Sequence, residues 1–157
     1  MRLSKLGLSP IDKYSKPVSQ KETKLATIFY MKARETAEKP GRALAVMWDE
    51  RLPLVKGFVN RYTYTVDFSK AGKSAGNHFH KVKQELFIPI KGEFTIHLAD
   101  VKSKKNEQIR VSAHQHAIIF IRTGIAHKVV AKSDVAVLLV IADHLNVEGD
   151  EFPYNVN

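Results

Sequence analysis

The chain contains no cysteine and no long apolar run, and these two absences exclude several classes of protein. Without cysteine there are no disulfides, thiolate chemistry or Cys-based zinc sites, so a bound metal must use His, carboxylate or water. No apolar run approaches membrane-spanning length, so we expect no membrane association. Residues 1–16 mix charges with a proline and lack the apolar stretch of a secretory signal, which predicts a cytoplasmic protein.

The length and composition are those of one globular domain. The 157 residues are 44% hydrophobic and 26% charged, which suits a single hydrophobic core. Residues 1–23 are polar and show neither helical nor strand periodicity. We therefore expect an extended N-terminal arm over residues 1–23 and one folded domain over residues 24–157.

Basic residues outnumber acidic residues by 25 to 16, and the formal net charge is +9. This excess favours an anionic partner, either a phosphorylated small-molecule substrate or a nucleic acid, and the sign of the charge does not choose between them. The basic residues are scattered, without the interleaved aromatics of a single-strand binding platform, and we find no helix-turn-helix or zinc finger. A nucleic-acid partner is therefore not expected.

Short apolar or alternating runs separated by turn formers fill the chain from Leu25 onward, and long amphipathic helices are missing. This pattern predicts an all-β fold, an antiparallel barrel or sandwich. Pro89 fits poorly inside its run, because proline cannot donate to a strand ladder and prefers edges or bulges. The expected strands cover residues 25–32, 43–48, 58–68, 78–79, 85–90, 93–98, 107–111, 117–121, 126–130 and 135–141.

Four side chains carry the functional prediction. His78 and His80 are separated by one residue, so a strand places both imidazoles on one face. Glu85 begins the next apolar run, and His127 follows a glycine-containing turn at the start of another. Imidazoles and a carboxylate form a ligand set that suits Zn, Mn, Fe, Ni or Co. We predict that these four residues bind one of these divalent metals and leave coordination positions open for substrate or water.

The spacing of these residues resembles the two signatures of the cupin family. This resemblance implies a cupin-type antiparallel β-barrel, or jelly roll, and a homodimer, because cupin barrels commonly pair through their outer sheets. The residues that match the first signature are Gly72, His78, His80, Glu85 and Gly92, and those that match the second are Gly124 and His127.

Segment 76–80, with the sequence G-N-H-F-H, resembles the G-N-H-x-H stretch of cupins that act on nucleotide sugars. These are the sugar nucleotide 3,4-ketoisomerases and the C-terminal cupin domain of bifunctional capsular-sugar epimerase/reductases. The ketoisomerases usually lack the carboxylate and the third imidazole that this chain has as Glu85 and His127. The epimerase cupin is therefore the closer model, and it implies an isomerase or epimerase that abstracts a proton beside a sugar ketone.

The implied reaction needs a base and groups that bind a diphosphate. A metal-bound imidazole cannot also be the base, so unligated residues are required. The candidate bases are Tyr62, Tyr64 and His116. The candidate diphosphate-binding residues are Arg61, Lys73 and Lys81.

Two other functions fit the same four ligands. An Fe(II) or Mn cupin dioxygenase or isomerase of a small organic acid would use them, and a dioxygenase would consume oxygen. A non-catalytic cupin would bind a small molecule without turnover.

Overall fold

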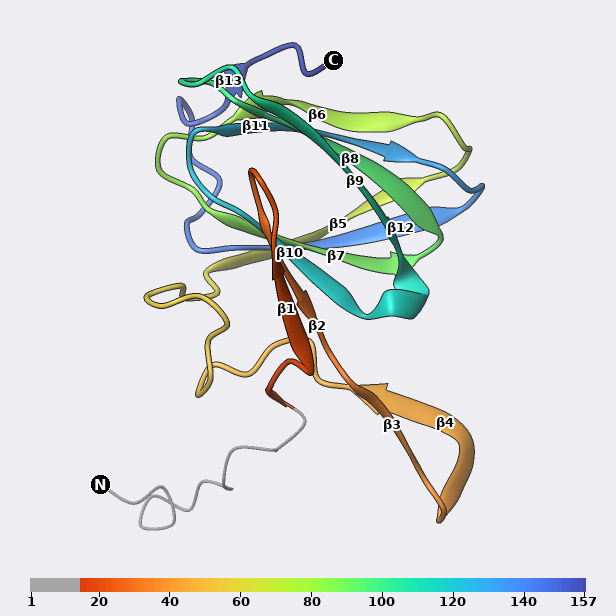
Figure 1. Cartoon of the computed structure of the whole chain (residues 1–157). Coiled ribbons are helices and arrows are strands. Elements are labelled where there is room, and N and C mark those ends of the chain that lie inside the picture. Colours follow the sequence, from red (N-terminus) through yellow and green to blue (C-terminus); the bar gives the residue numbers. More distant parts are fainter. Residues whose placement is uncertain (1–14) are drawn as a thin grey trace, which may run out of the picture.

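Two antiparallel sheets face each other in the computed structural model, which describes residues 15–157 (Figure 1). The six-stranded sheet contains, in spatial order, β1 (Ser19–Glu22), β2 (Thr27–Tyr30), β10 (Ala117–Ile121), β7 (Glu85–Lys91), β12 (Ala136–Ala142) and β5 (Tyr62–Phe68). The five-stranded sheet contains β13 (Phe152–Pro153), β6 (Ser74–Phe79), β11 (Ile125–Ala131), β8 (Glu93–Asp100) and β9 (Asn106–Ser112). The all-β prediction is confirmed.

Helical structure has only a small part in this fold. The 3-10 turn η3 (Ala113–Gln115) connects β9 to β10. None of the helices in the described part of the chain has the length and apolarity that crossing a bilayer requires.

Apolar side chains fill the space between the two sheets, because successive residues of a strand point to opposite faces. The inward residues of β8 are fully buried, whereas other residues of the same strand face outward. This inner core includes Phe68, Phe94, Ile96, Leu98, Ile119, Leu138 and Val140. A second cluster on the outer face of the six-stranded sheet includes Phe29, Phe58, Leu86, Ile88 and Ile118, with Trp48 packed against it.

The hairpin of β3 (Ala33–Thr36) and β4 (Lys39–Ala45) was not predicted as a unit. It projects away from both sheets (Figure 1), and residues 39–44 of β4 are exposed. The predicted strand over 43–48 is wrong beyond residue 45, and the predicted strand over 58–68 begins only at residue 62. The residues from 46 to 61 instead form a connection that supplies Trp48 and Phe58 to the outer cluster.

The expected N-terminal arm lies outside the described residues up to residue 14. Its remainder includes β1, which pairs with β2 along its whole length. The carboxylate of Glu107 on β9 accepts hydrogen bonds from the Thr23 hydroxyl and the Leu25 N–H, both at 2.8 Å. These bonds link one edge of the six-stranded sheet to the five-stranded sheet.

Pro89 lies inside β7 without breaking the sheet. The pairing of β7 with β12 shifts register between Val137 and Leu138, and Leu138 is the partner of Pro89. This irregularity is the kind of place where a strand tolerates a residue that has no N–H to donate.

Strands β6 and β11 approach most closely at Gly76. Gly76 has a φ of +100°, and a Cβ at this position would lie 2.5 Å from the carbonyl oxygen of His127. The register of the two strands also shifts between His127 and Lys128. Only a residue without a side chain fits here, so Gly76 sets how near His78 lies to His127.

We expect Gly76→Ala to destabilise the protein more than Gly72→Ala does. Both glycines have positive φ, but a Cβ at Gly72 would contact nothing within 4 Å. Both variants pay a strain of about 1 kcal/mol, whereas Gly76→Ala adds a clash of roughly 1–3 kcal/mol. Thermal unfolding measures the difference, and equal melting temperatures would contradict the close approach.

Candidate functional site

The three predicted histidine ligands meet at one end of the barrel, inside the space between the sheets. His78 is on β6, His80 follows that strand directly, and His127 lies opposite His78 on β11. One ring nitrogen from each lies within 4.8 Å of the others. Sheet pairing therefore brings together side chains that are almost fifty residues apart in the sequence.

The carboxylate of Glu85 enters this cluster from the opposite sheet, at the start of β7. Its side chain is almost completely buried, with 1% of the residue exposed. Its Oε2 atom is 3.4 Å from His127 Nε2 and 3.7 Å from His80 Nε2. The other oxygen, Oε1, accepts a hydrogen bond of 3.1 Å from the Tyr64 hydroxyl on β5.

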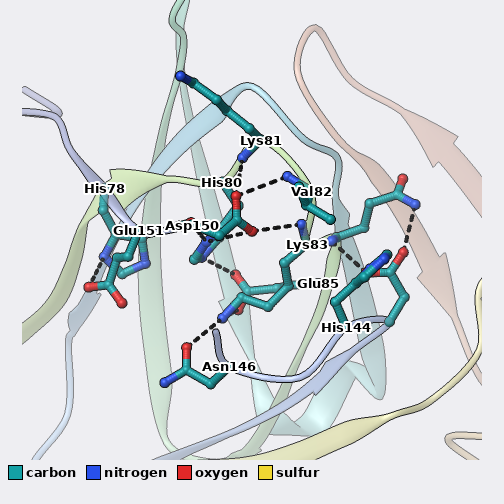
Figure 2. A network of polar contacts seen from close by, with 12 residues as sticks. His78, His80, Lys81, Val82, Lys83, Glu85, His144, Asn146, Asp150 and Glu151 are labelled. Carbon is teal, nitrogen blue, oxygen red and sulfur yellow. Dashed lines mark hydrogen bonds and ion pairs between the residues drawn. The ribbon is translucent and has the colours of Figure 1, made fainter. Parts of the chain in front are cut away.

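The carboxyl-terminal segment fixes the orientation of two imidazoles (Figure 2). His80 Nδ1 donates to the backbone carbonyl of Asp150 at 2.5 Å, and His78 Nδ1 lies 3.2 Å from Glu151 Oε1. A proton on Nδ1 leaves the lone pair on Nε2, the nitrogen that can bind a metal. Carbonyl and carboxylate partners of this kind commonly orient metal-binding histidines.

The carboxylate of Asp150 holds the loop between β6 and β7. It accepts backbone N–H groups from Lys81, Val82 and Lys83 at 2.8, 3.0 and 2.9 Å. Burial opposes ionisation of Asp150, but these hydrogen bonds outweigh it and keep the pKa of Asp150 below its usual value. Asp150 therefore ties the loop that carries His80 to the carboxyl-terminal segment.

Burial keeps the imidazoles in the form that binds metals. Removal from water lowers the pKa of His127 to about 4 and also lowers the pKa of His78. Glu85 opposes the shift at His127 but does not cancel it. Both side chains are thus neutral near pH 7, as ligation requires.

The donor atoms fit a divalent metal. His80 Nε2 and Glu85 Oε2 are buried and have no hydrogen-bond partner. Such atoms are costly to bury unless something else satisfies them. Ligand atoms around a tetrahedral zinc ion are separated by roughly 3.4 Å for bonds of about 2.1 Å. The separations of 3.4 and 3.7 Å from Glu85 Oε2 are close to that value.

Of the predicted bases, the structure brings two of three toward the cluster. Tyr64 contacts Glu85, and the ring centroid of Tyr62 lies 5.3 Å from that of Tyr64. His116 lies at the opposite end of β10, because the end of that strand near Ile121 is the one that pairs with Glu85. The length of the strand, on the order of 15 Å, separates His116 from the cluster. We therefore assign it no role in the chemistry.

The three predicted diphosphate-binding residues are dispersed. Arg61 lies at the site end of the barrel, where its N–H donates to the Ala142 carbonyl before β5 begins. The Lys81 ammonium lies 4.1 Å from the ring centroid of Phe152, on the outside of the barrel. Lys73 precedes β6 at the end opposite His78. The structure does not gather these three side chains at one place.

Sequence reasoning missed Lys83 and the roles of Asp150 and Glu151. Lys83 is buried, and its ammonium lies 3.7 Å from Glu85 Oε1. No local signal distinguishes it from exposed Lys81 two residues earlier. The two acidic residues lie in segment 149–154, with the sequence G-D-E-F-P-Y, which carries no local sign of a contact with the histidines.

Comparisons with known proteins agree with this architecture. A family model described as the polysaccharide biosynthesis C-terminal domain matches residues 55–149. A search of curated protein sequences returned no match. Among solved structures, a dTDP-4-dehydrorhamnose 3,5-epimerase from Bacillus anthracis with TDP and PPi bound has a TM-score of 0.73 at 14% identity, over 90% of this chain and 91% of that one.

Two ketoisomerase structures show the same fold. A 3,4-ketoisomerase from Helicobacter canadensis has a TM-score of 0.67 at 21% identity, over 81% of this chain and 89% of that one. A sugar 3,4-ketoisomerase from Thermoanaerobacterium thermosaccharolyticum in complex with TDP has a TM-score of 0.68 at 16% identity, over 83% and 89% of the two chains. These similarities confirm the predicted cupin jelly roll.

We expect protein purified without chelators to contain a divalent metal, and His127→Ala to lose it. Loss of a residue that only hydrogen-bonds to a metal ligand typically weakens metal binding roughly 10–100-fold. Loss of the ligand itself should weaken binding by at least as much. His114→Ala is the control, because His114 is an exposed histidine in η3. Metal analysis by mass spectrometry measures the content, and equal metal in both variants would exclude ligation by His127.

Proposed function

The chain belongs to the polysaccharide biosynthesis C-terminal domain family, and from this premise we propose that it is an isomerase or epimerase of a nucleotide-linked keto sugar. The observation that carries the proposal is the buried cluster of three imidazoles, Glu85 and Tyr64 inside a cupin barrel. Similar structures with TDP bound are named as a sugar epimerase and a ketoisomerase. The net charge of +9 suits an anionic substrate of this class.

The proposed chemistry is removal of a proton from the carbon beside a ketone, followed by its return. This reaction needs stabilisation of the enolate oxygen, a proton acceptor and a proton donor. His78, His80, Glu85 and His127 would hold the divalent metal, which as a Lewis acid would supply the electrophilic stabilisation. The buried setting of the cluster strengthens the electrostatic interactions within it.

Tyr64 is suited to donate the proton. Burial raises the pKa of its hydroxyl, and the negative charge of Glu85 raises it further. The hydroxyl therefore stays protonated at neutral pH and is not available as a base, so we assign it the role of proton donor. This assignment replaces the expectation that Tyr64 is the base. Tyr62, whose ring lies beside that of Tyr64 near the barrel surface, is then the candidate that would accept the proton from the sugar.

The contact between Glu151 and His78 supports a second mechanism for the same activity, in which His78 is the base and not a metal ligand. Glu151 holds Nδ1 of His78, and a carboxylate that orients an imidazole in this way is the pattern of a general base. His78 is also the least buried of the three histidines, so a substrate reaches it most easily. Metal ligation and base catalysis by this imidazole exclude each other, and metal analysis distinguishes them.

The homodimer implied by the cupin resemblance stays a prediction. Size-exclusion chromatography with light scattering measures it directly.

We expect nucleotide-linked 4-keto sugars to raise the melting temperature of the protein, since a ligand that binds only the folded state stabilises it. The same sugars should exchange hydrogen for deuterium beside the ketone in heavy water. Tyr64→Phe should slow the exchange by about 10²–10⁴-fold, the usual contribution of a positioned acid or base. Mass spectrometry of the recovered sugar measures the rate.

Tyr154→Phe is the matched control for this experiment. Tyr154 packs against Phe79 in the cluster of Ala99, Ala126 and Val156, apart from the imidazoles, so exchange should be unchanged. A melting temperature that no nucleotide sugar alters would contradict the substrate class. Binding without exchange would indicate a binding module, and oxygen consumption with iron would indicate a dioxygenase.

A further inference from the structure

Lys83 is a buried cation beside the cluster, and the proposed chemistry does not use it. Its side chain is 6% exposed, and its ammonium lies 3.7 Å from Glu85 Oε1. Lys81, in the same loop, is exposed. Figure 2 shows Lys83 pointing toward Glu85 and Asn146, whereas Lys81 extends away from them.

The loop conformation forces Lys83 inward. The Asp150 carboxylate accepts the backbone N–H groups of residues 81, 82 and 83, so the chain turns tightly around it. The side chains of Lys81 and Val82 consequently face solvent, and that of Lys83 enters the barrel. There the ammonium donates to Asn146 Oδ1 at 3.4 Å. Both ends of Lys83 are therefore held by the segment that follows β12.

The two oxygens of Glu85 have different surroundings. Oε1 has two partners, the Tyr64 hydroxyl at 3.1 Å and the Lys83 ammonium at 3.7 Å. Oε2 has no hydrogen-bond partner and lies nearest to the imidazole nitrogens of His127 and His80. The carboxylate is thus oriented before any ligand arrives, with one oxygen engaged and the other available.

We propose that Lys83 is a positioning residue, which with Tyr64 engages Oε1 of Glu85 so that the carboxylate presents Oε2 alone to the imidazoles. The inference rests on the metal-binding part of the proposed function. Glu85 would then offer a metal one oxygen, beside one nitrogen from each of the three histidines. The substrate would then add as a fifth ligand, an expansion that catalytic zinc sites can undergo.

Lys83 also compensates the buried charge of Glu85. A carboxylate that is taken out of water is tolerated only with a partner of opposite charge or with hydrogen bonds. Lys83 is the cation that contacts this carboxylate among the described residues. Without Lys83, Oε1 keeps only the hydrogen bond from Tyr64. Both oxygens of Glu85 could then bind the same metal.

The cobalt-substituted protein tests this inference without any substrate. Four-coordinate Co(II) absorbs visible light more strongly than five- or six-coordinate Co(II), so the spectrum reports how many positions Glu85 fills. We expect Lys83→Met to lose part of the visible absorption at saturating cobalt, because the carboxylate adds its second oxygen. Lys81→Met is the matched control and should keep the spectrum of the unaltered protein, since Lys81 contacts Phe152 and not Glu85.

Each outcome decides one point. An unchanged spectrum in Lys83→Met overturns the positioning role and leaves the metal site intact. If Lys83→Met does not fold, Tyr64→Phe removes the other partner of Oε1 and should lower the absorption in the same direction, and an unchanged spectrum there overturns the inference equally. If the unaltered protein binds no cobalt, the metal site and this inference both fail, whereas the deuterium-exchange experiment still tests the sugar chemistry.

Discussion

The contact of β6 with β11 at Gly76 is the constraint on which the site depends. Because Gly76 has no side chain, its backbone can lie against the carbonyl of His127, and the register shift beside it leaves His127 opposite His78. The imidazoles of both strands then point into the same space between the sheets. The remaining contributors, Glu85 and Tyr64, come from the facing sheet and need only the ordinary separation of two packed sheets to reach them.

The sequence was sufficient to single out four residues whose side chains the structure brings together. Alternation along a strand placed His78 and His80 on one face, and an apolar run beginning at Glu85 predicted β7 almost to its end. The turn before His127 likewise predicted the start of β11. These signals are local, and each depends on one strand and its flanking glycine. The convergence of the four side chains depends on pairing between distant strands, so only the resemblance to cupins predicted it.

The surroundings of the site could not be predicted for the same physical reason. Asp150 and Glu151 are about seventy residues from the histidines that they contact, and no periodicity connects the two segments. Lys83 and Lys81 have the same chemistry in the same loop, and only the turn around Asp150 makes one buried and the other exposed. The β3–β4 hairpin lacks a buried face along β4, so its sequence has no alternation to detect.

The unpartnered oxygen of Glu85 favours metal ligation over a purely acid–base cluster. With Nδ1 of His78 held by Glu151, its Nε2 lone pair can accept one partner, which is either a metal or a proton. A cluster that served only as a base would gain nothing from burying Glu85 Oε2 without a hydrogen bond, at a cost of about 1–3 kcal/mol. A cation held by Oε2 and the imidazole nitrogens would remove that cost. Metal binding therefore explains why a buried carboxylate lies among three histidines, whereas base catalysis alone does not.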